Sequence, residues 1–93
     1  MLKYYRDEYV AGGTAIRCDD EDGYPYADCS VCLADYGFIP PEDEIVVPTY
    51  KMMPADAQMI IGDLAKEVIG TVRFGYAEGT HIKLRDDWKE FCE

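Results

Sequence analysis

The sequence predicts a small α+β domain: an antiparallel sheet of hairpins packed on one central helix, with a cysteine-metal knuckle. Three observations predict it. One stretch has apolar residues at helical spacing, several short stretches alternate between glycine-rich turns, and three of the four cysteines lie close together. A chain of 93 residues is long enough for one domain, so we expect residues 1–93 to form a single domain.

The first element is a predicted hairpin within residues 3–17. Two short apolar stretches lie on either side of Ala11-Gly12-Gly13, of which the first is tyrosine-rich, and the glycine pair can supply the positive φ angles of a tight turn. Farther along, residues 44–47 have the composition of a strand. Pro48 confines this strand to an edge or an end of the sheet, because proline cannot donate a ladder hydrogen bond.

A helix is predicted from about Pro54 to Ile69. Pro54 suits a first helical turn, and Gly70 lies where a left-handed C-terminal cap is expected. The apolar residues that line up on one face of this helix are Ala57, Ile60, Ile61, Leu64, Ala65 and Val68.

A second hairpin is predicted at about residues 71–84, with its turn at residues 77–79. Ile82 and Leu84 should point inward and His81 should lie on the opposite face, because successive strand residues alternate. The tail, residues 86–93, could form one helical turn after an aspartate cap, with Trp88 and Phe91 on the same side.

The cysteines have the spacing of a structural zinc site. Cys29 and Cys32 form a CxxC pair, and Cys18 is a third thiol, separated from that pair by a loop of ten residues. The fourth ligand is Cys92, which completes a set of four thiolates, or alternatively His81. Two other interpretations are that the cysteines are free thiols, or that Cys29 and Cys32 are a thioredoxin-like redox pair. The neighbouring Asp28 argues against the redox pair, because its charge would raise the thiol pKa.

Nearly all the surplus negative charge lies in the same part of the chain. Of the net charge of −10, the segment from Cys18 to Tyr50 carries −9, because it holds nine acids and no Lys, Arg or His. We expect metal to tie down this acidic segment, residues 18–50, and its carboxylates to face a basic partner. The candidate partner-binding residues are Asp19, Asp20, Glu21, Asp22, Asp28, Glu42, Asp43 and Glu44.

Interpretations that give the acids no binding role also remain open. The run of residues 19–22 fails as an EF-hand, because Cys18 and Cys29 stand where carboxylate ligands are required. It could be a solvated loop, and overall acidity can serve solubility alone.

Composition also excludes several classes of function. Phosphate backbones and anionic membranes would repel a chain of charge −10, so neither direct nucleic-acid nor membrane binding is expected. No signal peptide or spanning stretch is evident, so the expected location is the cytoplasm. We expect no enzymatic activity, because the single histidine has no evident nucleophile and there is no glycine-rich phosphate loop.

The acidic, cysteine-containing segment resembles those of small phage anti-CRISPR proteins, in particular a metal-containing inhibitor of a type II-A CRISPR nuclease. The residues that carry this resemblance are Cys18, Cys29, Cys32, Asp19, Asp20, Glu21, Asp22, Asp28, Glu42, Asp43 and Glu44. The resemblance implies an inhibitor that binds a basic, nucleic-acid-handling surface of the nuclease and hinders DNA engagement. The alternative functions are a zinc-stabilised adaptor or regulatory protein of a mobile element, and a CxxC redox protein.

Overall fold

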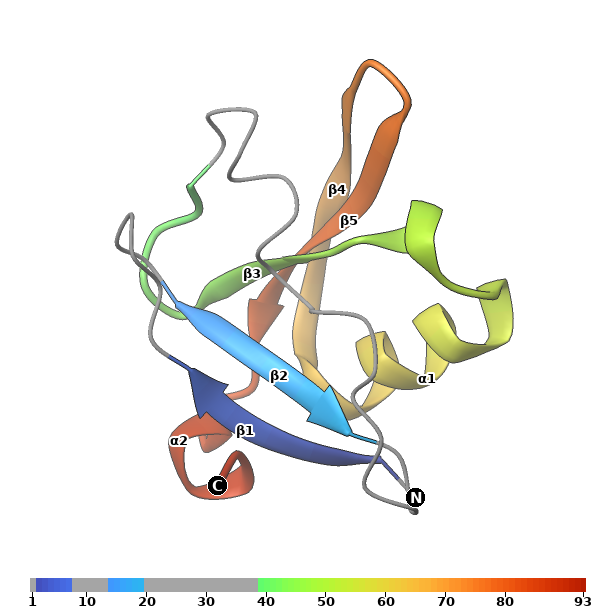
Figure 1. The fold of residues 1–93 in the computed structure, drawn as a ribbon. Coiled ribbons are helices and arrows are strands. Elements are labelled where there is room, and N and C mark those ends of the chain that lie inside the picture. Colours follow the sequence, from blue (N-terminus) through green and yellow to red (C-terminus); the bar gives the residue numbers. More distant parts are fainter. Residues whose placement is uncertain (1, 8–13, 20–38) are drawn as a thin grey trace.

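The computed structural model describes residues 2–7, 14–19 and 39–93, and it has the predicted α+β class. Figure 1 shows these elements along the chain. They are β1 (Lys3–Asp7), β2 (Ala15–Asp19), β3 (Glu44–Val47), the short 3-10 helix η2 (Thr49–Lys51), α1 (Pro54–Leu64), β4 (Ala65–Phe74), β5 (Ala77–Leu84) and α2 (Trp88–Phe91).

The first hairpin is confirmed. β1 and β2 pair in antiparallel register, with Lys3 opposite Asp19 and Asp7 opposite Ala15. The last residue of the chain extends this sheet on the other side of β1. Glu93 donates its amide to the Tyr4 carbonyl at 2.9 Å and accepts from the Arg6 amide at 2.8 Å, the pattern of a parallel strand pair.

The second sheet has three antiparallel strands in the order β3-β5-β4. β3 lies at its edge, as Pro48 predicted. The turn of the β4–β5 hairpin is formed by Gly75 and Tyr76 and not by residues 77–79, so that prediction was wrong. Gly75 has φ +63°, the left-handed conformation that a two-residue hairpin turn requires.

The helix begins at Pro54 as predicted, but it ends at Leu64 and not at Ile69. Residues 65–70 belong to β4 instead, so the second hairpin starts earlier than residue 71. Val68 and Ile69 are 55% and 48% exposed and do not contribute to the core. Such β-branched residues favour strands over helices, and pairing with β5 satisfies their backbone.

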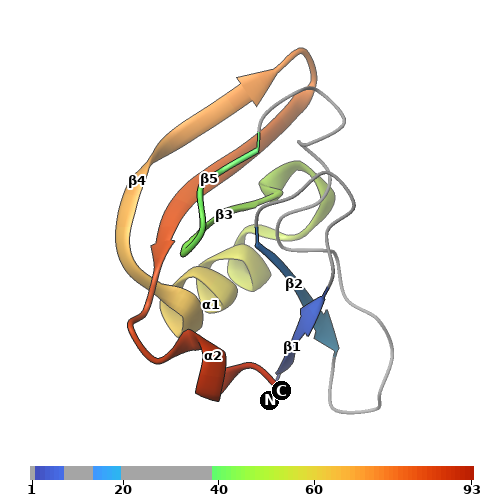
Figure 2. The same cartoon turned by 90° about the vertical axis from the view of Figure 1, so that its left-hand side faces the viewer.

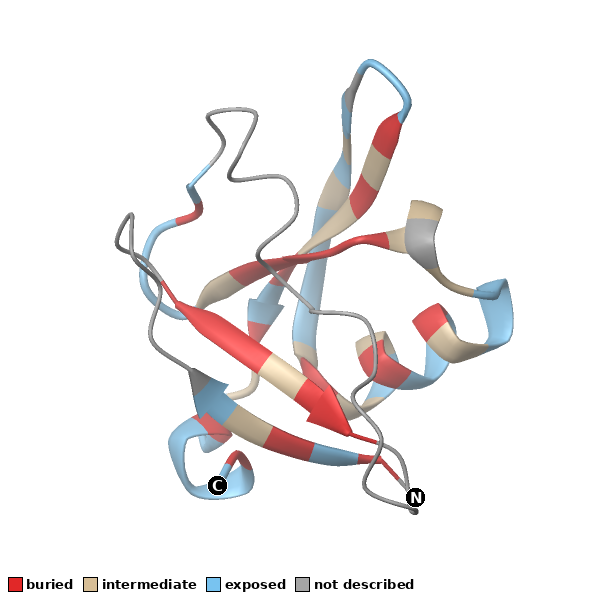
Figure 3. Cartoon of the chain, viewed as in Figure 1, coloured by how far each residue is buried: buried red, intermediate tan, exposed pale blue. Residues whose placement is uncertain are grey.

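The arrangement is not one sheet on one central helix. Figure 2 shows α1 between the three-stranded sheet and the β1–β2 hairpin, with α2 below them. One core cluster joins all four parts, and Figure 3 shows the buried residues along the strands that face it. Its members are Leu2, Tyr4, Ile16, Cys18, Ile45, Val47, Ile60, Leu64, Ile82, Leu84, Trp88 and Cys92.

A smaller cluster lies on the opposite face of the three-stranded sheet. Val46 and Ala77 are buried there, and Tyr50 and Val72 pack against them. Consequently Val46 is only 1% exposed although it points away from the main core. Within the described residues, no helix is long and apolar enough to cross a membrane.

Candidate functional site

Two of the predicted zinc ligands, Cys18 and Cys92, lie in the same buried cluster. Cys18 is on β2, fully buried and disulfide-bonded, whereas Cys92 follows α2 and is a free thiol that is 1% exposed. Burial raises the pKa of Cys92 to about 11. A disulfide sulfur is not the thiolate that zinc binds, so any zinc site that includes Cys18 requires the reduced chain.

His81, the alternative fourth ligand, lies on the other side of the three-stranded sheet. Its neighbour Ile82 points into the core with Cys18, whereas His81 shares the opposite face with Glu44. The His81 Nε2 atom is 2.7 Å from Glu44 Oε1. This placement separates His81 from the cluster that contains the two thiols.

The described residues alone contain no group of three or more His, Cys, Asp or Glu side chains positioned around a common metal. Cys29 and Cys32, the CxxC half of the predicted site, lie outside the described residues. The predicted partner-binding acids Asp20, Glu21, Asp22 and Asp28 also lie outside them.

The four described acids of the predicted binding set all contact other side chains of the same molecule. Asp19 accepts from Arg17 at 2.5 Å, and its side chain is 12% exposed. The three acids before and within β3 contact β5 and the C-terminal segment. The pairs are Glu42 with Lys89 at 3.2 Å, Asp43 with Trp88 at 2.7 Å, and Glu44 with His81 at 2.7 Å.

Among these acids, Asp43 has the most constrained position. Its backbone φ is +71°, in the left-handed region that aspartate tolerates better than most residues. Its carboxylate accepts from Trp88 Nε1, and its carbonyl accepts from the Leu84 amide at 2.8 Å. Asp43 therefore joins the turn before β3 to β5 and to α2.

Beside Asp43, a cleft of about 460 Å³ opens between the β1–β2 hairpin, the segment before β3 and α2. Its lining combines one base, one acid and an indole ring with prolines and small side chains. The lining residues are Arg6, Thr14, Ala15, Pro40, Pro41, Glu42 and Trp88. The Glu42 side chain is 70% exposed at this rim, so it is available to solvent as well as to Lys89.

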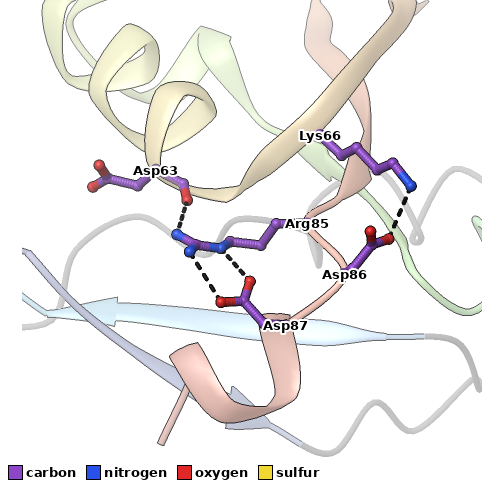
Figure 4. Close-up of polar contacts among 5 residues, drawn as sticks. All are labelled: Asp63, Lys66, Arg85, Asp86 and Asp87. Carbon is purple, nitrogen blue, oxygen red and sulfur yellow. Dashed lines mark hydrogen bonds and ion pairs between the residues drawn. The ribbon is translucent and has the colours of Figure 1, made fainter.

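A second polar cluster, which the sequence did not predict, joins α1 to the segment before α2 (Figure 4). Arg85 Nε and Nη2 donate to the two carboxylate oxygens of Asp87 at 2.5 and 3.1 Å, and Nη1 donates to the Asp63 carbonyl at 3.2 Å. These hydrogen bonds from Arg85 lower the pKa of Asp87. Nearby, Lys66 Nζ donates to Asp86 at 2.9 Å.

Three further contacts complete this cluster. The Arg85 guanidinium lies 4.2 Å from the centroid of the Phe91 ring, which is in turn 5.5 Å from the ring of Tyr4. Tyr4 Oη donates to Asp63 Oδ2 at 2.5 Å. Burial, together with the neighbouring Asp63 carboxylate, raises the pKa of Tyr4 far above its ordinary value.

The sequence contained one signal for the Arg85–Asp87 pair, namely an arginine two residues before an aspartate at a helix start. It contained none for Tyr4 and Asp63, which are 59 positions apart. In Figure 4, Asp86 and Asp87 each accept from a base of the same chain. The Asp63 carboxylate accepts from Tyr4 instead. Because every acid of this cluster has a donor within the chain, the cluster has a structural role: it connects α1, β1 and the segment before α2.

Comparison with known proteins adds no relative to this picture. No protein-family model, curated protein or solved structure matches the chain.

Proposed function

We propose that this protein is a non-enzymatic inhibitor that binds a basic, nucleic-acid-handling protein surface, in the manner of small anti-CRISPR proteins, and hinders DNA engagement. The observation that carries the proposal is the uneven charge. Residues 18–50 hold nine acids without one base, whereas the β4–β5 hairpin carries +1, from Lys66, Arg73 and Lys83 against Glu67 and Glu78. The partner we have in mind is a type II-A CRISPR nuclease of the host cytoplasm.

Electrostatics gives this proposal its physical basis. A nuclease that holds nucleic acid in a positively charged channel offers lysines and arginines spaced to contact phosphates. A dense set of carboxylates can occupy the same cations, and complementary fields raise the association rate more than the final affinity. The excess of −9 in residues 18–50 supplies such a field.

The described acids support the proposal to different degrees. Glu42 fits best, because its side chain is 70% exposed and its contact with Lys89 is a surface ion pair, worth only about 0–1 kcal/mol. Asp19 fits least, because its side chain is 12% exposed and already bonded to Arg17. Among the described acids, we therefore assign partner contact to Glu42, and a positioning role to Asp19, Asp43 and Glu44.

Zinc belongs to the same proposal as a structural element. In the reduced chain, Cys18, Cys29, Cys32 and Cys92 would hold Zn²⁺ as four thiolates, which leaves no open position for a reactive water. The burial of Cys18 and Cys92 in one cluster favours Cys92 over His81 as the fourth ligand. The metal would fix the acidic segment against the core.

The test is a comparison of two charge-matched triple variants binding to a purified type II-A nuclease loaded with guide RNA. The first variant converts Asp20, Glu21 and Asp22 to their amides. The second converts Asp56, Glu78 and Glu90, which lie outside the acidic segment. Both have net charge −7, because each loses three of the ten surplus negative charges.

The first variant should slow association by roughly tenfold at low salt and flatten its salt dependence, whereas the second should bind nearly as the parent does. Equal effects of the two variants would mean that only net charge matters. If the parent fails to bind the nuclease, the inhibitor proposal is wrong and the adaptor function takes its place.

A further inference from the structure

β4 has an open edge in the described structure. It lies at the end of the order β3-β5-β4, and Figure 2 shows it at the outer edge of the sheet. It is also the longest of the described strands, with ten residues, and two large apolar side chains on it are exposed: Val68 at 55% and Ile69 at 48%. An open strand edge with exposed apolar side chains is a template for pairing with another strand.

Charge points to a specific occupant of this edge. The hairpin that contains β4 carries +1 while the remaining chain carries −11, so the hairpin has no part in the acidic excess. A second copy of the chain can approach here with little repulsion. The strand itself carries an acid, Glu67, near one end and a base, Arg73, near the other.

Antiparallel pairing of two β4 strands about a two-fold axis at Gly70 brings these charges together. A residue on one side of Gly70 then faces the residue of the other copy that lies equally far on the other side of Gly70. Glu67 of each copy therefore faces Arg73 of the other. Val68 likewise faces Val72. β4 has irregularities in its pairing with β5 at Lys66 and Ile69, but Glu and Arg are long enough to meet across diagonal as well as direct positions.

The present contacts leave both charges available. Among the described residues, the Glu67 side chain makes no hydrogen bond or ion pair, and Arg73 uses Nε to donate to the Gly75 carbonyl at 3.2 Å. We propose that the protein forms a symmetric dimer through antiparallel β4–β4 pairing, held by the apolar side chains and by two Glu67–Arg73 ion pairs between the copies. Such an isologous contact closes on itself and leaves no further β4 edge.

Sedimentation velocity of the full chain in a dilution series at physiological salt tests the dimer. The parent protein should reach twice its 10.6 kDa mass. Glu67→Arg should weaken dimerisation by roughly tenfold or more, because both ion pairs become repulsive. Net charge alone predicts the opposite result. The variant has net charge −8, so its copies repel each other less than copies of the parent do, and association would become stronger if only net charge mattered. Glu90→Arg on α2 is the matched control and should not weaken the dimer.

The double variant E67R/R73E separates the proposal from loss of folding. Within one chain, Glu67 faces Lys83 and Arg73 faces Glu78. The double variant therefore places like charges opposite each other at both positions of the β4–β5 ladder. Only the pairs between copies are restored, and dimerisation should recover. A monomeric parent at all concentrations, a double variant as weak as Glu67→Arg, or equal weakening by Glu90→Arg overturns the proposal.

Discussion

At the scale of single residues, the acids that the sequence assigned to a partner also hold the molecule together. Glu42, Asp43 and Glu44 contact Lys89, Trp88 and His81, three residues 37 to 47 positions farther along the chain. Acid content alone predicts exposure and repulsion, but it does not predict where a base or an indole donor will lie after folding. A substitution of one of these acids can therefore change the stability of the fold, so stability must be measured before a change in partner binding is interpreted.

Asp43→Ala should destabilise the protein by about 1–3 kcal/mol, because it leaves Trp88 Nε1 without its acceptor. Asp43→Asn should cost less, since asparagine keeps an acceptor oxygen and tolerates the φ of +71°. Trp88 is the only tryptophan, so its fluorescence during urea unfolding reports both variants directly. Asp43→Gly separates the two contributions: it relieves the backbone strain but lacks the acceptor. A glycine variant as stable as the parent would rule out the hydrogen bond as the main contribution.

Tyr4 gives a prediction in alkaline solution. Its pKa is raised in the folded state, chiefly by burial, so folding favours the protonated phenol. The resulting stability is fully present below the ordinary tyrosine pKa of about 10 and is lost as the pH rises above it. Tyr4→Phe should cost about 1.5–3 kcal/mol at neutral pH through the lost bond to Asp63. The difference from the parent should shrink above pH 10, as measured by urea unfolding. A difference that stays constant with pH would contradict this account.

At the scale of elements, the sequence predicted the type of every described α-helix and β-strand, but it missed the 3-10 helix η2 and misplaced two boundaries. Pro54 and Pro48 are local signals, and each marks its element in the structure. The two strands predicted around the first glycine pair also pair with each other, whereas the turn itself lies outside the described residues. The helix end at Leu64 is different, because residues 65–70 have apolar residues at both helical and strand spacing. Pairing with β5, a contact with residues farther along the chain, decides between the two.

The cysteine and acid predictions show the same limit. The sequence predicted that the four thiols form one group, and the structure places two of them, Cys18 and Cys92, in one buried cluster. Spacing could not exclude His81 as a ligand. Strand alternation placed it on the face opposite Ile82, but the sequence does not show that the two thiols pack on the Ile82 side of the sheet. The Tyr4–Asp63 bond depends on how α1 packs against β1, which no local pattern encodes.

Two glycines make an element-scale prediction with an internal control. Neither Gly62 in α1 nor Gly75 in the β4–β5 turn has an atom within 4 Å of an added Cβ, so sterics are equal. Gly62→Ala should stabilise the protein by about 0.5–1 kcal/mol, because helical alanine loses less backbone entropy. Gly75→Ala should destabilise it by about 1 kcal/mol, because φ is +63°. Thermal unfolding measures both, and shifts of the same sign would contradict the backbone assignments.

At the scale of the whole molecule, the acidic segment of residues 18–50 is anchored in the core at both ends. Cys18 on β2 and Ile45 on β3 belong to the same buried cluster and are fully buried. The nine acids between residues 18 and 50 repel one another, so the segment costs free energy that the core and a cross-link offset. A disulfide or a zinc ion could each supply that cross-link, and the two are mutually exclusive at Cys18.

This exclusion leads to the last prediction. The reduced protein should bind about one Zn²⁺ per chain, whereas the oxidised protein should bind none, because a disulfide at Cys18 removes a thiolate ligand. Metal content measured by mass spectrometry, with thiol titration on the same samples, checks both states. Chelation of the reduced protein should lower its melting temperature, since structural zinc contributes folding free energy.

Cobalt substitution then identifies the fourth ligand of the same site. Cys92→Ser should change the thiolate spectrum, whereas His81→Ala should leave it unchanged, because His81 lies on the opposite face of the sheet from Cys18 and Cys92. Zinc-loaded protein in which all four thiols still react in the native state would contradict the site, because bound thiolates are protected.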